Sequence, residues 1–141
     1  MLHINDKVIA ADSNRKPGKF DYNIEYMPEA GMLGTEYVGS DRYAVVCISV
    51  DSPKRVSLLR LGFDDEDEMM RILDIDTDSD GVQRVSDETL EEIKKSLSYG
   101  DIEKWSMRRG HNGKNYWKEM NKAYSTTVHW GIAKPYRDPD F

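Results

Sequence analysis

Residues 20–26, FDYNIEY, alternate strictly between apolar and polar side chains. Aromatic or aliphatic residues occupy positions 20, 22, 24 and 26, and polar residues occupy the positions between them. A period of two places all the apolar side chains on one face of an extended chain. We therefore predict that this segment is a strand with one buried face.

Residues 42–61 contain two apolar runs on either side of a turn signal. The runs RYAVVCISV and RVSLLRL flank DSPK, in which Pro53 suits the second position of a turn. This pattern predicts an antiparallel hairpin. Because every residue from 44 to 48 is apolar, we expect a central strand that is buried on both faces. A further short strand is predicted over residues 7–11, with irregular connections before and after FDYNIEY.

From residue 64 the apolar residues adopt helical spacing. The segment DDEDEMMRILDI begins with acidic residues, which the helix macrodipole favours in a first turn. Its apolar residues are expected to form a partly buried face, made of Met69, Met70, Ile72 and Leu73. The sequence therefore predicts a helix over the first part of this region.

A second helix is predicted to begin at Ser86 and to stop at Gly100. Val85 and Leu90 occupy the two positions of a hydrophobic staple around its first turn. Leu90, Ile93 and Leu97 continue as one apolar stripe. Glycine is the residue that most often ends a helix.

The C-terminal third is predicted to contain two more helices and one strand. Residues 101–110, DIEKWSMRRG, are interpreted as a short helix. Residues 113–124, GKNYWKEMNKAY, place Tyr116 and Trp117 on one side and lysines on the other at helical spacing. Residues 126–132, TTVHWGI, alternate again and predict a returning strand, followed by an extended tail.

These elements predict an α+β fold in one domain. The expected order is an N-terminal antiparallel sheet of about four strands, three to four helices and a returning C-terminal strand. A chain of 141 residues is close to the commonest size of a single domain. We divide it into a strand-rich part (1–63), an acidic helical part (64–92), a basic helical and strand part (93–137) and an extended tail (134–141).

The composition indicates a soluble protein and excludes several classes. With 38% hydrophobic and 33% charged residues, the chain is typical of globular proteins rather than disordered ones. No apolar run approaches the ~18 residues of a membrane span, and no secretory signal opens the chain. We expect a cytoplasmic protein with no membrane partner. The single cysteine, Cys47, lies in an apolar run and is expected to be buried and unreactive.

The net charge of −6 conceals a strong separation of charge along the chain. Residues 64–92 contain 13 acidic and 2 basic side chains, whereas residues 93–137 contain 10 basic and 3 acidic ones. Such asymmetry is typical of surfaces that select a partner by charge. The acidic part is predicted to dock on a basic protein surface through Asp64, Asp65, Glu66, Asp67, Glu68, Asp74, Asp76, Asp78 and Asp80.

The stretch DTDSDGVQRVSD has the spacing of a calcium loop. Counted from Asp76, it places carboxylates at positions 1, 3, 5 and 12 and glycine at position 6, namely Asp76, Asp78, Asp80, Asp87 and Gly81. It resembles an EF-hand loop, and more closely the dockerin type, which also ends on Asp. The resemblance implies a bound calcium ion; no other cofactor is predicted. The second half departs from the pattern, because the helix predicted from Ser86 starts two residues late. The alternative is a solvated acidic loop.

The basic segment MRRGHNGKNYWKEMNK supports a different function. It combines cations for phosphate contacts with aromatic rings for base stacking. The candidate nucleic-acid face, within residues 104–122, consists of Arg108, Arg109, Lys114, Lys118 and Lys122. On the predicted helix, however, Tyr116 and Trp117 lie on the apolar face, which favours a role in the core.

No motif in the sequence indicates a particular enzymatic reaction. His111, Asn121 and His129 resemble in outline the His, Asn and His of HNH nucleases, but the segment between them is predicted to be helical where that family has a hairpin. The chain is therefore expected not to be an enzyme. The function that the sequence favours is a small acidic protein-binding module, such as an inhibitor, an immunity protein, a phage-encoded antagonist or a nucleic-acid mimic.

Overall fold

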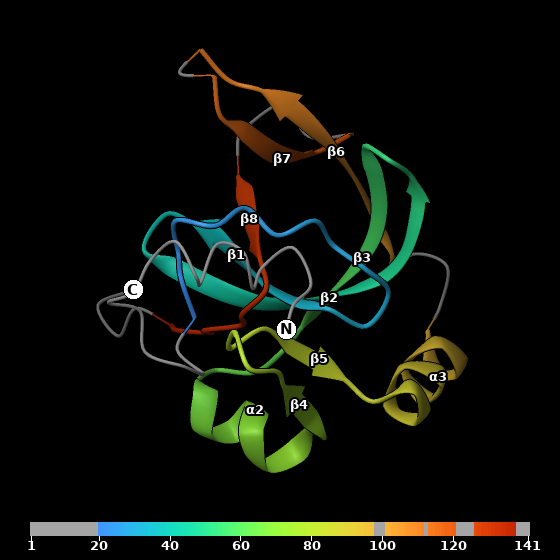
Figure 1. The fold of residues 1–141 in the computed structure, drawn as a ribbon. Helices are drawn as coiled ribbons and strands as arrows, with labels where there is room; N and C mark the ends of the chain where they lie inside the picture. Colours follow the sequence, from blue (N-terminus) through green and yellow to red (C-terminus); the bar gives the residue numbers. More distant parts are fainter. Residues whose placement is uncertain (1–19, 98–100, 112, 121–125, 138–141) are drawn as a thin grey trace.

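The computed structural model describes residues 20–97, 101–111, 113–120 and 126–137 (Figure 1). Within these ranges the strands are β1 (Leu33–Val38), β2 (Asp41–Ser52), β3 (Arg55–Leu61), β4 (Ile75–Thr77), β5 (Gln83–Val85), β6 (Glu103–Arg109), β7 (Asn115–Glu119) and β8 (Thr127–Trp130). The helices are α2 (Glu66–Ile72) and α3 (Asp87–Ser96). In this part of the chain, no helix has the length and apolar character needed to cross a membrane.

The fold is a small antiparallel barrel, and the predicted α+β class is wrong. Six strands pair in the order β7-β6-β3-β2-β1-β8, and β4 and β5 form a separate two-stranded hairpin. The sheet curls until its end strands, β7 and β8, contact each other (Figure 1). No ladder joins these two strands in the described residues, so the barrel is nearly closed, with a seam between them.

The predicted hairpin over residues 42–61 is confirmed as β2 and β3. Pro53 and Lys54 form its turn, and Ser52 pairs with Arg55 across it. The segment 44–48 is buried on both faces, as its unbroken apolar run predicts. Alternate residues of β2 face two different cores, one inside the barrel and one outside it.

Two hydrophobic clusters therefore share the central strands. The inner cluster fills the barrel and consists of Phe20, Tyr26, Met32, Val45, Cys47, Val56, Leu58, Val82, Trp105, Trp117, Val128 and Trp130. The outer cluster lies between the sheet and the elements inserted after β3, and it consists of Leu33, Ala44, Val46, Ile48, Met69, Val85, Leu90 and Ala133. The segment with α2, β4, β5 and α3 is thus an external cover on the barrel (Figure 1).

The helix predictions for residues 64–92 are confirmed at their starts. Asp65 caps α2 by accepting a hydrogen bond from the Glu68 backbone N–H at 2.8 Å. Ser86 caps α3 in the same way through the Thr89 N–H, and the Val85–Leu90 staple is buried. The predicted buried face of α2 is only partly correct. Met69 is fully buried, whereas Met70 and Ile72 are 52% and 63% exposed.

Residues 20–26 do not form the predicted strand. The Asp21 side chain accepts a hydrogen bond from the Asn23 N–H at 2.9 Å, and the Asp21 carbonyl accepts one from the Ile24 N–H at 3.2 Å. These local bonds turn the chain and compete with extension. Phe20 and Tyr26 still reach the inner cluster, but Tyr22 is 51% exposed.

Within the described residues, the two helices predicted over residues 101–110 and 113–124 are replaced by the hairpin β6–β7; residues 121–124 lie outside the described ranges. Its turn is closed by hydrogen bonds from the Gly110 N–H to the Lys114 carbonyl and from the Gly113 N–H to the Gly110 carbonyl. In a strand, Trp117 faces the core and Tyr116 faces outward, so the predicted shared face does not exist. The dipeptide Asn112-Gly113 is a strong hairpin signal in the sequence, and it competes with the helical spacing of the apolar residues.

The returning strand is confirmed as β8. In the described part of the tail, Tyr136 exchanges backbone hydrogen bonds with Arg42 at 2.8 and 2.9 Å. The strand predicted over residues 7–11 and the helix stop predicted at Gly100 lie outside the described residues.

Candidate functional site

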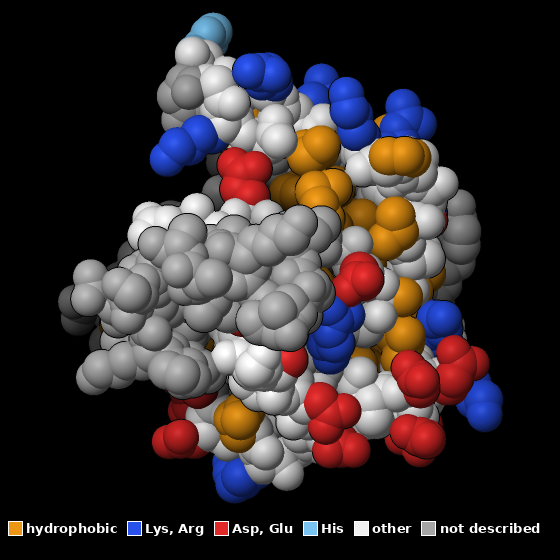
Figure 2. All heavy atoms as spheres, in the orientation of Figure 1, with side chains coloured by type: hydrophobic (Ala, Val, Ile, Leu, Met, Phe, Trp, Pro, Cys, Tyr) orange, Lys and Arg blue, Asp and Glu red, His pale blue; other side chains and the backbone are white. Residues whose placement is uncertain are grey.

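The charges that are separated along the chain are partly separated in space, because Lys134 and Arg137 lie beside Glu66 and Asp64. Figure 2 shows acidic side chains at the end of the molecule that carries α2, the β4–β5 hairpin and α3, and basic side chains at the opposite end, over the β6–β7 hairpin and the β2–β3 turn. The nine acidic residues singled out from the sequence lie on α2, on the connections before and after it and on the β4–β5 hairpin. Eight of them are exposed or half-buried, and Asp80 is fully buried.

Several of these carboxylates have local structural roles. The Glu68 side chain accepts a hydrogen bond from the Asp64 N–H at 3.0 Å, which complements the Asp65 cap. Glu66 forms an ion pair with Lys134 at 3.0 Å, and Asp64 lies 3.8 Å from Arg137. Within the described residues, no ion pair involves Asp67, Asp74 or Asp76. We call these three carboxylates and the exposed Met70 and Ile72 the acidic surface.

The calcium-loop spacing lies on a β-hairpin rather than between two helices. Asp76 is in β4, and Asp78 opens the turn, where its side chain accepts hydrogen bonds from the Asp80 and Val82 N–H groups at 2.8 and 3.0 Å. Asp87 belongs to the first turn of α3, beyond β5. The described residues contain no group of three or more His, Cys, Asp or Glu side chains arranged to hold a metal ion. The Asp78 side chain therefore stabilises the turn between β4 and β5.

The basic residues divide between two faces of the β6–β7 hairpin. Arg108 pairs directly with Tyr116, and Lys118 pairs with Ser106, so these four residues point to the outer face of the barrel. Arg109 pairs with Asn115 on the other face, and Lys114 lies in the turn. Lys122 lies outside the described residues.

A polar network on the same outer face engages Lys104. Its Nζ donates to Ser57 Oγ at 2.6 Å and lies 3.3 Å from Asp51 Oδ2, which also accepts from Ser57 Oγ at 2.6 Å. Although burial raises it, hydrogen bonds from Ser57, Ser49 and Lys104 lower the pKa of the Asp51 carboxyl overall. The network holds β2, β3 and β6 together.

Of the three residues that resemble the HNH pattern, the structure describes His111 and His129, which lie on separate elements. His111 is exposed in the β6–β7 turn, His129 lies on β8, and Asn121 is outside the described residues. The His129 ring packs against Phe20 and Tyr22, with ring centroids 5.9 and 5.8 Å apart. Burial lowers the pKa of His129, although a hydrogen bond with the Tyr22 backbone and the nearby Glu25 carboxylate raise it. His129 is therefore neutral at pH 7.

Cys47 is fully buried in the inner cluster, as predicted. Burial, with a smaller effect from the Asp51 charge, raises the pKa of its thiol to about 12. A thiol with so high a pKa forms almost no thiolate at neutral pH, so Cys47 is not a nucleophile in the folded protein.

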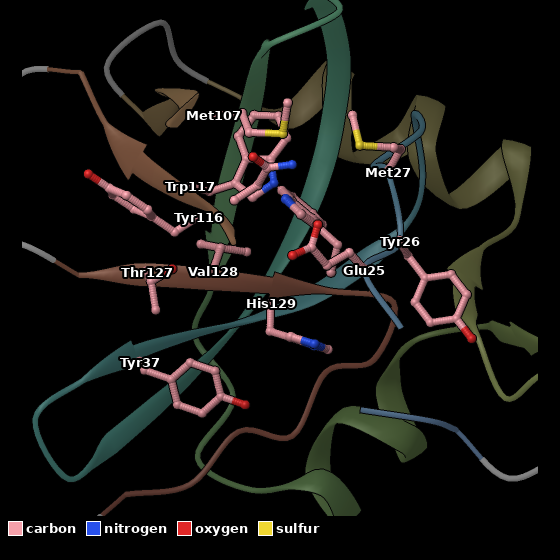
Figure 3. Close-up of a pocket in the computed structure, with 12 residues that line it drawn as sticks. Glu25, Tyr26, Met27, Tyr37, Met107, Tyr116, Trp117, Thr127, Val128 and His129 are labelled. Atoms are coloured by element: carbon pink, nitrogen blue, oxygen red, sulfur yellow. The ribbon is translucent and has the colours of Figure 1, made fainter. Parts of the chain in front are cut away.

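A pocket that the sequence did not predict lies at the seam of the barrel. We call it the seam pocket; its cavity volume is about 180 Å³. It is lined by Glu25, Tyr26, Met27, Tyr37, Met107, Asn115, Tyr116, Trp117, Thr127, Val128, His129 and Trp130. These residues come from β1, β6, β7, β8 and the segment before β1, and Figure 3 shows that the Tyr116 ring points away from the others.

The indole rings in the wall of the seam pocket are held tightly. Trp117 and Trp130 meet nearly edge to face, with ring centroids 6.5 Å apart and an interplanar angle of 87°. Gly34 pairs with Trp130, and a Cβ atom at Gly34 would lie 2.8 Å from the indole, so only glycine leaves room for the ring. Trp130 Nε1 and His129 Nδ1 are buried without a hydrogen-bond partner in the described part of the chain. Such atoms are typical of sites that bind a water molecule or a ligand.

The chain matches no known protein family, curated protein or solved structure.

Sequence reasoning missed the seam pocket because no local pattern encodes it. Its aromatic residues lie at positions 26, 37, 116, 117 and 130, and only barrel closure brings them together. The signal that was available is compositional: the chain has 3 Trp and 8 Tyr, and the Asn-Gly turn would have turned one Tyr outward next to a buried Trp.

Proposed function

We propose that this protein is a protein-binding module that docks on a basic partner through the acidic surface. The observation that supports it is the combination of exposed apolar and acidic side chains on α2. Asp67 and Met70 lie three residues apart on α2 and so share one stripe of the helix, and the exposed Asp74 follows its C-cap, Leu73. Protein interfaces typically have an apolar centre with a charged rim.

The helix that carries this stripe is fixed before binding. Met69 anchors it in the outer cluster, Asp65 caps its start, and the Leu73 N–H donates to the Met69 carbonyl at 2.9 Å at its end. A fixed helix loses little conformational freedom on association. The carboxylates are expected to attract a basic partner at long range and so to raise the association rate. A small inhibitor, an immunity-type protein or a phage-encoded antagonist that mimics nucleic-acid charge would act in this way.

Neutralising the acidic surface is expected to slow association about tenfold at low salt and to flatten its salt dependence. The variant is Asp67→Asn, Asp74→Asn and Asp76→Asn, and the measurement is the association rate with the basic protein that co-purifies from the native host's lysate. The control, Glu88→Gln, Glu91→Gln and Glu92→Gln, makes the same change of net charge on α3. The double variant Met70→Ser, Ile72→Ser is expected to raise the dissociation rate instead. Equal association rates for the two triple variants would contradict a specific docking surface.

The β6–β7 hairpin favours a second candidate, binding of single-stranded nucleic acid. Because Tyr116 is 40% exposed and lies directly opposite Arg108, an aromatic ring and a cation share the outer face. Lys118 and Arg55 lie on the same face, each paired with Ser106. Stacking and phosphate contacts use this combination of groups.

If the hairpin binds nucleic acid, a gel-shift assay with a short single-stranded oligonucleotide will show a complex at low salt. Tyr116→Ala is expected to weaken it by about 1–3 kcal/mol through lost stacking, and Arg108→Ala with Lys118→Ala to reduce its salt dependence. The control, Lys94→Ala with Lys95→Ala, removes two exposed cations from α3. A nucleic-acid mimic predicts no complex with any oligonucleotide, so absence of a shift excludes this candidate.

A further inference from the structure

The seam pocket has the chemistry of a site for an organic cation. Aromatic rings dominate its wall, and two of them, Trp117 and Trp130, stand at 87° to each other. The negative faces of aromatic rings attract cations, and Trp and Tyr do so most strongly. An arrangement of rings at steep angles can present several faces to one compact group.

The charges of the lining residues have the matching sign. Glu25 is the one lining residue with a formal charge, and among the described residues that line the pocket there is neither lysine nor arginine. In Figure 3 the Glu25 carboxylate points toward the β8 side chains that line the pocket. His129 contributes no positive charge near pH 7, because burial keeps its ring neutral.

The size and apolar character of the pocket select the kind of cation. At about 180 Å³ the cavity is smaller than the ~300–1,000 Å³ typical of pockets for larger ligands. Met27, Met107 and Val128 add apolar surface to the rings. A primary ammonium has three N–H donors, and Glu25 is the one lining carboxylate that could accept them. Donors left without an acceptor would lose their hydrogen bonds to water, which disfavours binding. A methylated ammonium has few donors or none, and its methyl groups match the apolar wall.

We propose that the seam pocket binds a methylated ammonium group, with the aromatic rings around the methyl groups and Glu25 as the counter-charge. The group belongs either to a free small molecule such as choline or to the side chain of a methylated lysine in a peptide. The pocket is built from β1, β6, β7, β8 and the segment before β1, whereas the acidic surface lies on α2 and β4. The two proposals can therefore fail independently.

The test is a titration of the intact protein that is followed by tryptophan fluorescence and calorimetry. Choline is expected to give saturable binding, and the neutral tert-butyl analogue of choline, which has the same shape without the charge, is expected to bind much more weakly. Glu25→Gln should weaken choline binding roughly three- to fivefold. Glu25 is exposed, so the variant is expected to fold, which circular dichroism will check.

A matched control and a second ligand make the outcome decisive. Glu88→Gln removes one carboxylate from α3 and should leave choline binding unchanged. A peptide with trimethyllysine distinguishes the two sources of the group, since tighter binding than choline assigns the site to a side chain and weaker binding assigns it to a free quaternary ammonium compound. The proposal is overturned if choline shows no saturable binding, if the tert-butyl analogue binds as well, or if Glu25→Gln has no effect.

Discussion

Replacing Arg60 with methionine is expected to lower the free energy of unfolding by about 3–5 kcal/mol. Arg60 Nε and Nη2 donate to the two carboxylate oxygens of Glu36 at 3.1 and 3.0 Å. The Glu36 side chain is fully buried between β2 and β8, and its other hydrogen bond comes from Thr126 Oγ1 at 3.2 Å. Methionine preserves much of the volume but leaves the carboxylate buried without its counter-charge.

A second substitution at Glu36 separates this effect from lost packing. In the double variant Arg60→Met, Glu36→Gln the buried charge is absent, so part of the stability should return. Urea unfolding gives the free energy of unfolding of the unmodified protein, the two single variants and the double variant. The coupling energy between Arg60 and Glu36 is the loss in the double variant minus the sum of the losses in the two single variants. The control Arg55→Met removes an exposed arginine from the same strand and should change stability by less than about 0.5 kcal/mol. Similar losses for Arg55→Met and Arg60→Met would contradict the role of the pair.

Replacing Trp105 with alanine is expected to cost about 3–5 kcal/mol, comparable with the loss at Arg60. Trp105 is fully buried in the inner cluster, and its Nε1 donates to Glu103 Oε1 at 3.2 Å. The loss combines the transfer of a large apolar side chain with the cavity that remains in the barrel. Chemical unfolding measures it, with Met120→Ala as the control, because Met120 is 42% exposed at the end of β7. A loss below about 1 kcal/mol at Trp105 would show that β6 does not pack as described.

Local sequence signals predicted the structure correctly where an element is specified by residues within one short segment. Pro53 at a turn between two apolar runs predicted β2 and β3, and the cap at Ser86 with the Val85–Leu90 staple predicted the start of α3 to the residue. These features depend on hydrogen bonds and contacts between near neighbours, which the sequence displays directly.

The same reasoning failed where two patterns compete. The spacing of Tyr116, Trp117 and Met120 suits a helix, but in the barrel Trp117 alone of the three is buried. Residues 20–26 alternate as a strand does, yet the Asp21 side chain binds the backbone and turns the chain. In both cases contacts with distant residues, or a competing local hydrogen bond, decided between conformations that the apolar pattern left nearly equal.

The sequence by itself determined the segregation of charge, the burial of Cys47, the central hairpin and the start of α3, because each depends on residues close together in the chain. Only the tertiary structure decided that residues 103–109 and 115–119 form strands, that the acidic α2 and the basic β6–β7 hairpin lie at opposite ends, and that aromatic side chains converge at the seam between β7 and β8. The physical reason is that the pairing of β1 with β8 and of β3 with β6 joins residues far apart in sequence. Burial in the shared core stabilises that pairing, and burial of this kind leaves no periodic signature in any one segment.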